Sequence, residues 1–180
     1  MFCKVHSAAI SGIDAMPVTV EADVSDGMPQ FTMVGFVSSQ VREAQERVRT
    51  ALRNLGYRLP PQRIIINLAP GDLRKEGTRF DLPIAASILC ALGKIPEEIL
   101  RQTMIVGELH LDGSIGPVNG ILPTALLAQE EGLQTCIVPA RNEAEGHVVD
   151  TIRIVPVRSL GDFINFCEGK EPETEPVLPD

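Results

Sequence analysis

Residues 67–88, NLAPGDLRKEGTRFDLPIAASI, decide the fold, because one short run holds a strand end, a broken loop and a helix entry. The strand that leads into it, at 63–70, contains three consecutive isoleucines, which predict burial on both faces. Residues 82–92 are apolar on nearly every side and predict a central buried helix, with Thr78 or Asp81 as its cap. The stretch therefore has the layout of a catalytic or ligand-binding loop.

The segments before this stretch favour β-structure. Alternation over residues 17–25 predicts a strand with one buried face, and further strands are expected at 3–9 and 30–36. The DGMP turn at 26–29 predicts a hairpin between the second and third of these strands. Residues 38–56 then change to a spacing of three or four, which predicts a single amphipathic helix.

The segments after the stretch alternate between helices and strands. This order predicts an α+β domain, a mixed β-sheet packed with helices, over residues 1–167. Residues 168–180 are rich in Pro and Glu and predict an acidic linker or tail. The elements expected in this part are helices at 96–102, 121–130, 140–147 and 159–167, and strands at 103–109, 135–139 and 152–157.

Length and composition are those of an ordinary globular domain. The chain has 180 residues, of which 44% are hydrophobic and 22% charged. No run approaches the roughly 20 apolar residues of a membrane helix, and the N-terminus has no signal-peptide layout, so we expect a cytoplasmic protein without membrane contact. The four cysteines are scattered, without C-x-x-C pairs or paired histidines, which predicts reduced, buried thiols and no metal site.

Charge is distributed unevenly along the chain. Residues 1–80 carry ten Lys and Arg against eight Asp and Glu, whereas residues 81–180 carry six against sixteen. A nucleic-acid surface in the first part is compatible with this pattern, although the net charge of −8 does not argue for it. Glu43 and Glu46 interleave the arginines of the helix predicted at 38–56, which favours a solvated face over a DNA-binding stripe.

The loop lacks the motifs of nucleotide sites and of serine nucleophiles. Gly71 and Gly77 are six apart and Thr78, not Lys, follows, so no Walker A loop is present, and G-x-G-x-x-G is absent as well. Ser87 falls inside the apolar helix, where a hydroxyl bonded to its own backbone is expected, and Ser114 falls in a turn. Thr78 is left as the one hydroxyl of the loop.

Three long segments carry a resemblance to a known family. Residues 4–36, 41–89 and 107–145 resemble the N-terminal domain of the ComM (YifB) family of magnesium-chelatase-like AAA+ ATPases, and NLAPGDLRKEGTRFDLPIA is the most specific motif. The resemblance covers about residues 1–167 and implies a Lon-protease-like domain with the ribosomal-protein superfold. It also implies that ATP and Mg bind only in an AAA+ module beyond the linker, so that this chain has no cofactor of its own.

The same resemblance bears on catalysis. Lon-type peptidases use a Ser-Lys dyad, whose Ser position falls on Arg79 of KEGTRFD and whose Lys position falls on Leu122 of NGILP. A guanidinium cannot be the nucleophile and a leucine cannot take its proton. The resemblance therefore implies the fold of a peptidase without its activity.

The leading hypothesis is a non-catalytic accessory domain of a hexamer-forming ATPase implicated in DNA processing, including branch migration during natural transformation. In this hypothesis the domain helps to assemble the ring or to guide DNA. The expected partners are its own AAA+ module, neighbouring protomers and DNA. Arg74, Lys75 and Arg79 are the candidates for phosphate or DNA contact, since three cations precede a helix N-terminus. The other loop residues that we single out are Asn67, Pro70, Asp72, Gly77, Phe80 and Asp81.

Three alternatives stay open at this point. The loop cations could form a structural salt-bridge network with the neighbouring carboxylates. Thr78 could be an unconventional nucleophile with Lys75 as its base, which would make the chain a peptidase-type enzyme. The chain could also be a protein-interaction module without DNA contact. The carboxylates of the network are Asp72, Glu76 and Asp81, and the apolar residues of the interaction module are Met28, Phe36 and Phe80.

Overall fold

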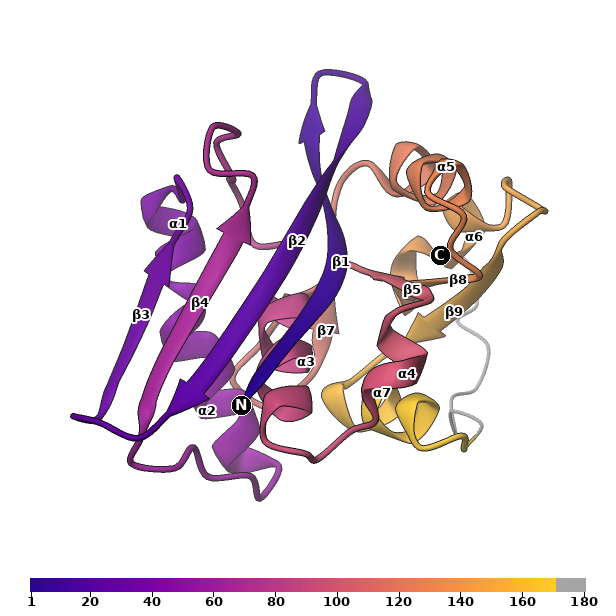
Figure 1. The fold of residues 1–180 in the computed structure, drawn as a ribbon. Helices are drawn as coiled ribbons and strands as arrows, with labels where there is room; N and C mark the ends of the chain where they lie inside the picture. Colours follow the sequence, from indigo (N-terminus) through magenta and orange to yellow (C-terminus); the bar gives the residue numbers. More distant parts are fainter. Residues whose placement is uncertain (171–180) are drawn as a thin grey trace.

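The computed structural model describes residues 1–170 and has a mixed β-sheet at its centre (Figure 1). Its strands are β1 (Phe2–Ser11), β2 (Asp14–Ser25), β3 (Gln30–Val34), β4 (Arg63–Ala69), β5 (Thr103–Ile105), β6 (Glu108–Leu109), β7 (Ile115–Gly116), β8 (Thr135–Pro139) and β9 (Arg153–Val157). Seven of these strands form one sheet in the order β3-β4-β2-β1-β5-β8-β9, and β6 and β7 form a separate ribbon. The predicted α+β class with a mixed sheet is confirmed.

The helices occupy nearly all the predicted positions. They are α1 (Ser39–Arg42), α2 (Ala44–Asn54), α3 (Asp81–Ala91), α4 (Glu97–Leu100), α5 (Ile121–Glu130), α6 (Glu143–Gly146) and α7 (Leu160–Cys167), with a 3₁₀ turn, η1 (Ala140–Asn142). Within residues 1–170, none of these helices has the length and apolar character needed to cross a bilayer. Most of the linker predicted at 168–180 lies outside the described residues, so the domain boundary stays a prediction.

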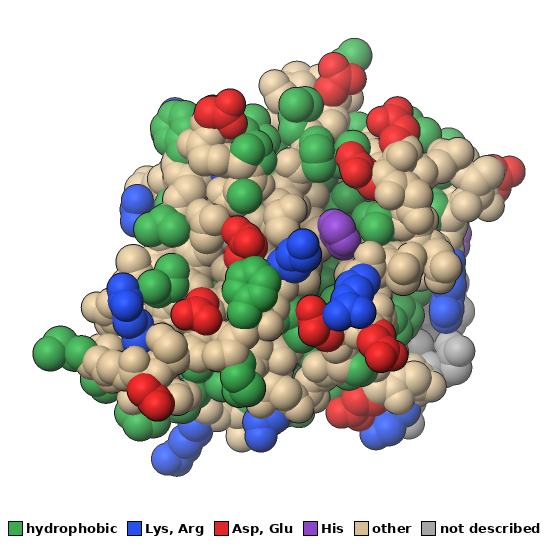
Figure 2. Space-filling model, viewed as in Figure 1, with side chains coloured by type: hydrophobic (Ala, Val, Ile, Leu, Met, Phe, Trp, Pro, Cys, Tyr) green, Lys and Arg blue, Asp and Glu red, His purple; other side chains and the backbone are tan. Residues whose placement is uncertain are grey.

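In the half of the sheet formed by β3, β4, β2 and β1, α2 and α3 cover one face, whereas on the other face α5 reaches only the end of β1 and β2 at which Ala8 is buried. Val18, Val20 and Ala22 of β2 point into the core, where α3 packs against β1 and β2. Lys4 and Glu21, which lie opposite each other on β1 and β2, point to the other face. Figure 1 shows α2 and α3 behind this half, and Figure 2 shows acidic, basic and hydrophobic side chains mixed over its open face. That face has no field of a single sign.

The other half, β5-β8-β9, is covered on both faces. Every residue of β8 is buried, and neighbouring side chains belong to different clusters: Ile137 packs in the cluster of α3 and Val138 in the cluster of α5. Side chains alternate across a strand, so the two clusters lie on opposite faces of β8. The both-sided burial predicted for β4 was wrong: Ile64 and Ile66 are buried, while the exposed fraction of Ile65 is intermediate.

The hairpin predicted at 26–29 was also wrong. β2 pairs antiparallel with β4 from Thr19 to Ser25, and β3 pairs parallel with the far side of β4. The chain does reverse at this turn, but β4 is inserted between the two strands. A local turn signal gives the reversal and cannot reveal a strand that arrives from much later in the sequence.

The helix predicted over 38–56 is two helices, because the chain breaks at Glu43 between α1 and α2. Ser38 is the N-cap of the first helix, and its hydroxyl accepts a hydrogen bond from the Val41 amide at 3.2 Å. The cap predicted for α3 was wrong as well. Phe80 occupies the N-cap position without a side-chain bond, and Asp81 is the first helical residue.

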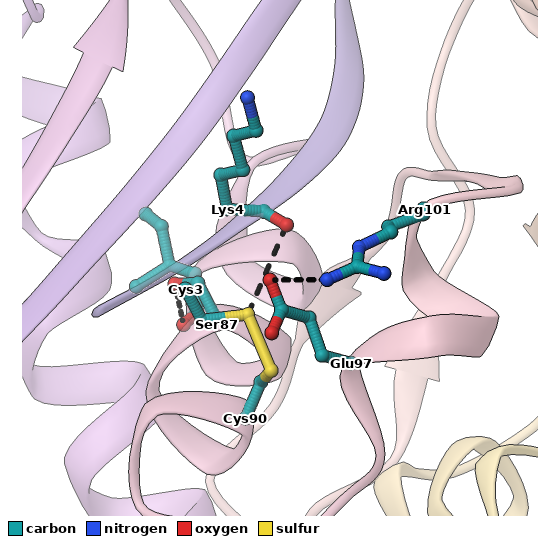
Figure 3. Close-up of a disulfide and its surroundings, with 7 residues drawn as sticks. Cys3, Lys4, Ser87, Cys90, Glu97 and Arg101 are labelled. Carbon is teal, nitrogen blue, oxygen red and sulfur yellow. Dashed lines mark hydrogen bonds and ion pairs between the residues drawn. A yellow bond between two sulfur atoms is a disulfide. The ribbon is translucent and has the colours of Figure 1, made fainter. Parts of the chain in front are cut away.

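Cys3 and Cys90 form a disulfide that links β1 to the end of α3 (Figure 3). The prediction that all four cysteines are reduced was therefore wrong, while Cys136 and Cys167 are free and buried as expected. The two bonded residues are 87 positions apart in the sequence, but packing of α3 on β1 brings their Cα atoms to 6.0 Å. That separation is within the usual range for a disulfide.

Reduction of this disulfide should lower the free energy of unfolding by about 2–4 kcal/mol, because the bond restricts a long loop of the unfolded chain. The measurement is urea denaturation with and without dithiothreitol. A Cys3→Ser, Cys90→Ser variant serves as the control and should show one midpoint under both conditions. Equal midpoints for the unsubstituted chain would contradict the prediction.

Candidate functional site

The loop between β4 and α3 carries the residues singled out from the sequence. Asn67 lies in β4 shortly before the loop, and its side-chain amide donates to Glu21 at 2.8 Å on the open face of the sheet. Gly77 has a φ of 82°, a backbone conformation in which glycine is strongly favoured. Phe80 is 1% exposed and belongs to the core. The loop is therefore attached to the sheet at its beginning and to the core at its end.

Lys75 is a residue of the loop whose side chain points into the protein. Its side chain is fully buried, and Nζ donates to the carbonyl oxygens of Gly35, at 2.5 Å, and Pro70. Burial lowers the pKa of this amine, while Asp72 acts in the opposite direction. Lys75 thus ties the loop to the chain that follows β3, and its ammonium is directed at backbone carbonyls, away from solvent.

Arg79 is the second buried cation and is 6% exposed. Its Nε donates to the Ala8 carbonyl at 2.7 Å, one terminal nitrogen donates to the Asn119 carbonyl at 2.6 Å, and the other donates to Thr124 Oγ1 at 2.7 Å. Burial lowers the pKa of this guanidinium to about 10, so it remains charged at neutral pH. One side chain therefore joins β1, the loop before α5 and α5 itself.

Asp81 forms a buried ion pair that the sequence did not reveal. Its carboxylate accepts from Arg47 Nε at 2.7 Å and from a second guanidinium nitrogen at 3.0 Å, and it also accepts from the Leu109 amide at 3.0 Å. Burial raises the pKa of Asp81, while Arg47 and the Leu109 amide oppose the rise. This bidentate pair joins α2 to the start of α3.

Only Arg74 of the three predicted phosphate contacts has an exposed charge. Its side chain is 59% exposed and pairs with Glu76 at 3.3 Å. Beside it is a hollow of about 440 Å³, lined among others by Thr78, Arg79 and Asn119. Contact between this loop and DNA stays a prediction, and the geometry assigns any such contact at the loop surface to Arg74.

Of the salt-bridge network that was considered for the loop, one ion pair is present and another is not. Arg74 and Glu76 do pair within the loop, but the partner of Asp81 is Arg47 of α2 and not a loop cation. In the sequence Arg47 is one of several arginines of the helix predicted at 38–56, and its guanidinium also lies 3.5 Å from Glu43. No local pattern could have connected it with a residue 34 positions later.

The structure also tests the roles predicted for Ser87 and Ser114. Ser87 Oγ donates to the Ile84 carbonyl at 2.8 Å, and Ser114 Oγ donates to Asp112 at 2.7 Å, so the helix and turn roles expected for these serines are confirmed. Thr124 was missed as a partner of Arg79. Its hydroxyl also donates to the Gly120 carbonyl at 2.7 Å. Within residues 1–170, no group of three His, Cys, Asp or Glu side chains is placed to hold a metal.

The class of this domain is defined by two features. One is the mixed sheet, and the other is the arrangement of β4, the loop with Arg79 and the buried helix α3. Lon protease 2 of Bacillus subtilis is 30% identical to it over 146 residues, which are 77% of this chain and 26% of that protein. Together with the mixed sheet, this similarity supports a Lon-protease-like domain, as the sequence resemblance implied.

Residues 20–142 match the family model described as subunit ChlI of Mg-chelatase, and the chain belongs to that family. Competence protein ComM of Haemophilus influenzae is 41% identical over 167 residues, covering 93% of this chain and 33% of that protein. The protein YifB of Escherichia coli is 41% identical over 166 residues, with 92% and 33% covered. The chain spans about a third of the length of these relatives. The resemblance to the ComM (YifB) family is thus confirmed.

Proposed function

We propose that this chain is a non-catalytic accessory domain of a magnesium-chelatase-like AAA+ ATPase that processes DNA, and that it helps to assemble the ATPase ring or to guide DNA. The observation that carries the proposal is Arg79. It stands where the resemblance puts the nucleophile of Lon-type peptidases, and its guanidinium is fully engaged by three acceptors of the same chain. A site filled in this way has a structural role.

The hydroxyl of Thr124 and the amine of Lys75, both near this position, are engaged as well. Thr124 Oγ1 accepts from Arg79 and donates to Gly120. Lys75, the base considered for Thr78, is directed at two backbone carbonyls. Leu122, at the position that the resemblance gives to the Lon-type lysine, is a 39% exposed side chain of α5. These contacts favour the accessory role over a peptidase that uses Thr78.

Two further observations support a role in assembly or DNA guidance. One relative is named a competence protein, and it is about three times as long as this chain, so further parts of such a protein are available as partners. Several large apolar side chains are exposed on the present chain. They are Ile13, at 89%, in the turn between β1 and β2, Met28, at 80%, and Phe36, at 56%. Phe80 is buried and takes no part in such contacts.

The absence of catalysis is tested by incubating the chain with labelled casein and with a hydroxyl-directed covalent probe. We expect neither hydrolysis nor labelling. Casein hydrolysis that disappears in a Thr78→Val variant would overturn the non-catalytic part of the proposal.

DNA guidance is tested by fluorescence anisotropy with labelled single-stranded and branched DNA between about 50 and 200 mM salt. We expect binding that weakens with salt, and an Arg74→Ala variant should reduce the slope of log K against log salt by about one. Arg101→Ala is the matched control, since Arg101 is also exposed and paired with a glutamate, Glu97, at 3.6 Å. If neither the single-stranded nor the branched DNA binds at the lowest salt, DNA guidance is ruled out.

A further inference from the structure

A second hollow lies away from the loop, where the start of β3, the end of α2 and the connection from α2 to β4 meet. Its volume is about 470 Å³, within the range of roughly 300–1,000 Å³ that is usual for small-ligand sites. Figure 2 shows basic side chains along the left and lower edge of the molecule, where Figure 1 has β3 and the connection after α2. The residues of this hollow that matter here are Phe31, Arg49, Arg53, Arg58, Leu59 and Ile64.

All charged side chains that line this pocket are positive. Arg49, Arg53 and Arg58 line it and are exposed, and its lining contains neither Asp nor Glu. Arg49 and Arg53 are four residues apart on α2, a spacing at which like charges repel. Among the described residues, none of the three arginines has a carboxylate in an ion pair. Three converging guanidinium groups without a carboxylate are suited to an anion from outside the chain.

Two carboxylates near the pocket do not neutralise it. Asp26 accepts a hydrogen bond from Gln62, a residue of the pocket lining, at 3.0 Å. Glu46 lies one turn before Arg49 on α2 and is exposed. The positive charge of the pocket therefore remains available to a ligand.

The pocket also offers flat and apolar surfaces. The Arg49 guanidinium lies over the Phe31 ring, 5.7 Å from its centroid, which leaves a stacked pair of planar groups beside the pocket. Leu59 is half-buried and Ile64 is 2% exposed, so both contribute apolar walls. Planar aromatic and guanidinium groups next to free cations are the surfaces on which nucleic-acid bases stack while their phosphates are neutralised.

We infer that this pocket binds a nucleoside phosphate unit, with the phosphate held by Arg53 and Arg58 and the base held against Arg49 and Phe31. The source of this unit is a single strand of nucleic acid. The choice of that source rests on the proposed function in DNA processing, whereas the chemistry of the pocket would suit a free nucleotide too. The pocket lies apart from the loop that carries Arg74, so the two surfaces can be tested separately.

The experiment measures binding of the chain to a labelled single-stranded oligonucleotide and, in a parallel arm, to a labelled free nucleotide. Arg53→Ala, Arg58→Ala should reduce the salt slope for the oligonucleotide by about two, because two phosphate contacts are removed. Phe31→Leu should weaken binding by about tenfold with little change in the slope, because it removes the stacking surface and no charge. The charge-matched control is Lys94→Ala, Arg101→Ala, two exposed cations elsewhere, and it should leave the affinity close to that of the unsubstituted chain.

The outcomes separate this inference from the proposed function. Oligonucleotide binding that is equal in the Arg53→Ala, Arg58→Ala variant and in its control overturns the pocket and leaves DNA guidance intact. Binding of the free nucleotide alone, lost in the same variant, supports the pocket chemistry and overturns the nucleic-acid source, while DNA guidance then depends on the result with branched DNA. Absence of binding to both probes overturns the pocket, and DNA guidance is overturned as well if branched DNA also fails to bind. The arginines are exposed, and circular dichroism of the variant checks that it is folded.

Discussion

Arg79→Ala is expected to lower the free energy of unfolding by about 3–5 kcal/mol, as measured by urea denaturation. The substitution removes a buried side chain and leaves the acceptors on Ala8, Asn119 and Thr124 without their donors. An unmade hydrogen bond at a buried acceptor costs about 1–3 kcal/mol, and the space left behind adds to the loss. Burial of the charged guanidinium is unfavourable, which is why the pKa of Arg79 is lowered. Removal of that buried charge offsets part of the loss of stability.

Two further substitutions at this position separate volume from hydrogen bonding. Arg79→Met fills most of the space and removes the buried charge, so its loss should be smaller than that of Arg79→Ala. Arg79→Lys keeps the charge, but a single ammonium cannot reproduce a planar fork that reaches three separate acceptors, so it should not restore full stability. Arg74→Ala, which removes a 59% exposed cation of the same loop, should change stability by less than about 0.5 kcal/mol.

The result has a direct bearing on function. If Arg79→Ala were as stable as the unsubstituted chain, the guanidinium would not be needed for folding and could serve a ligand. A large loss would instead place Arg79 among the groups that hold the fold together at the position of a nucleophile. The same denaturation series thus tests the structural role on which the proposed lack of catalysis depends.

Local patterns were sufficient to predict most of the elements of this fold. The apolar helix α3, the helix α5 and the strand β8 were predicted because each has a regular spacing or run within one short segment, bounded by Gly or Pro. The both-sided burial expected for β4 belongs to β8, because coverage by α5 on the second face depends on where the chain folds back. Burial on a particular face is a property of the assembled sheet, and three consecutive isoleucines do not determine it.

The contacts that the sequence did not predict, in the fold and at the site, share one physical cause: they join residues that are far apart in the sequence. The Cys3–Cys90 bond, the Arg47–Asp81 pair and the Arg79–Thr124 bond span 87, 34 and 45 residues. The sequence placed three cations on one loop and so predicted one basic surface. In the structure two of the three point inward, because backbone carbonyls and a threonine hydroxyl supply acceptors that no residue pattern displays.

Arg47→Met is expected to lower the free energy of unfolding by about 3–5 kcal/mol at pH 8, because it leaves the carboxylate of Asp81, 1% exposed, without its cation. The loss should be smaller at acid pH. Burial raises the pKa of Asp81 above its unfolded value, and removal of Arg47 raises it further. The folded state then binds more protons than the unfolded state, so stability falls as pH rises through the raised pKa of Asp81. Urea denaturation from pH 5 to 8 measures this slope.

The double variant Arg47→Met, Asp81→Asn isolates the charge from the rest of the contact. An asparagine oxygen can still accept from the Leu109 amide, and it carries no charge that needs a partner. We therefore expect the double variant to recover most of the stability lost in Arg47→Met and to lose its pH dependence between 5 and 8. If the double variant were no more stable than Arg47→Met, the loss would come from packing of the Arg47 side chain. The ion pair would then not be what holds α2 against the start of α3.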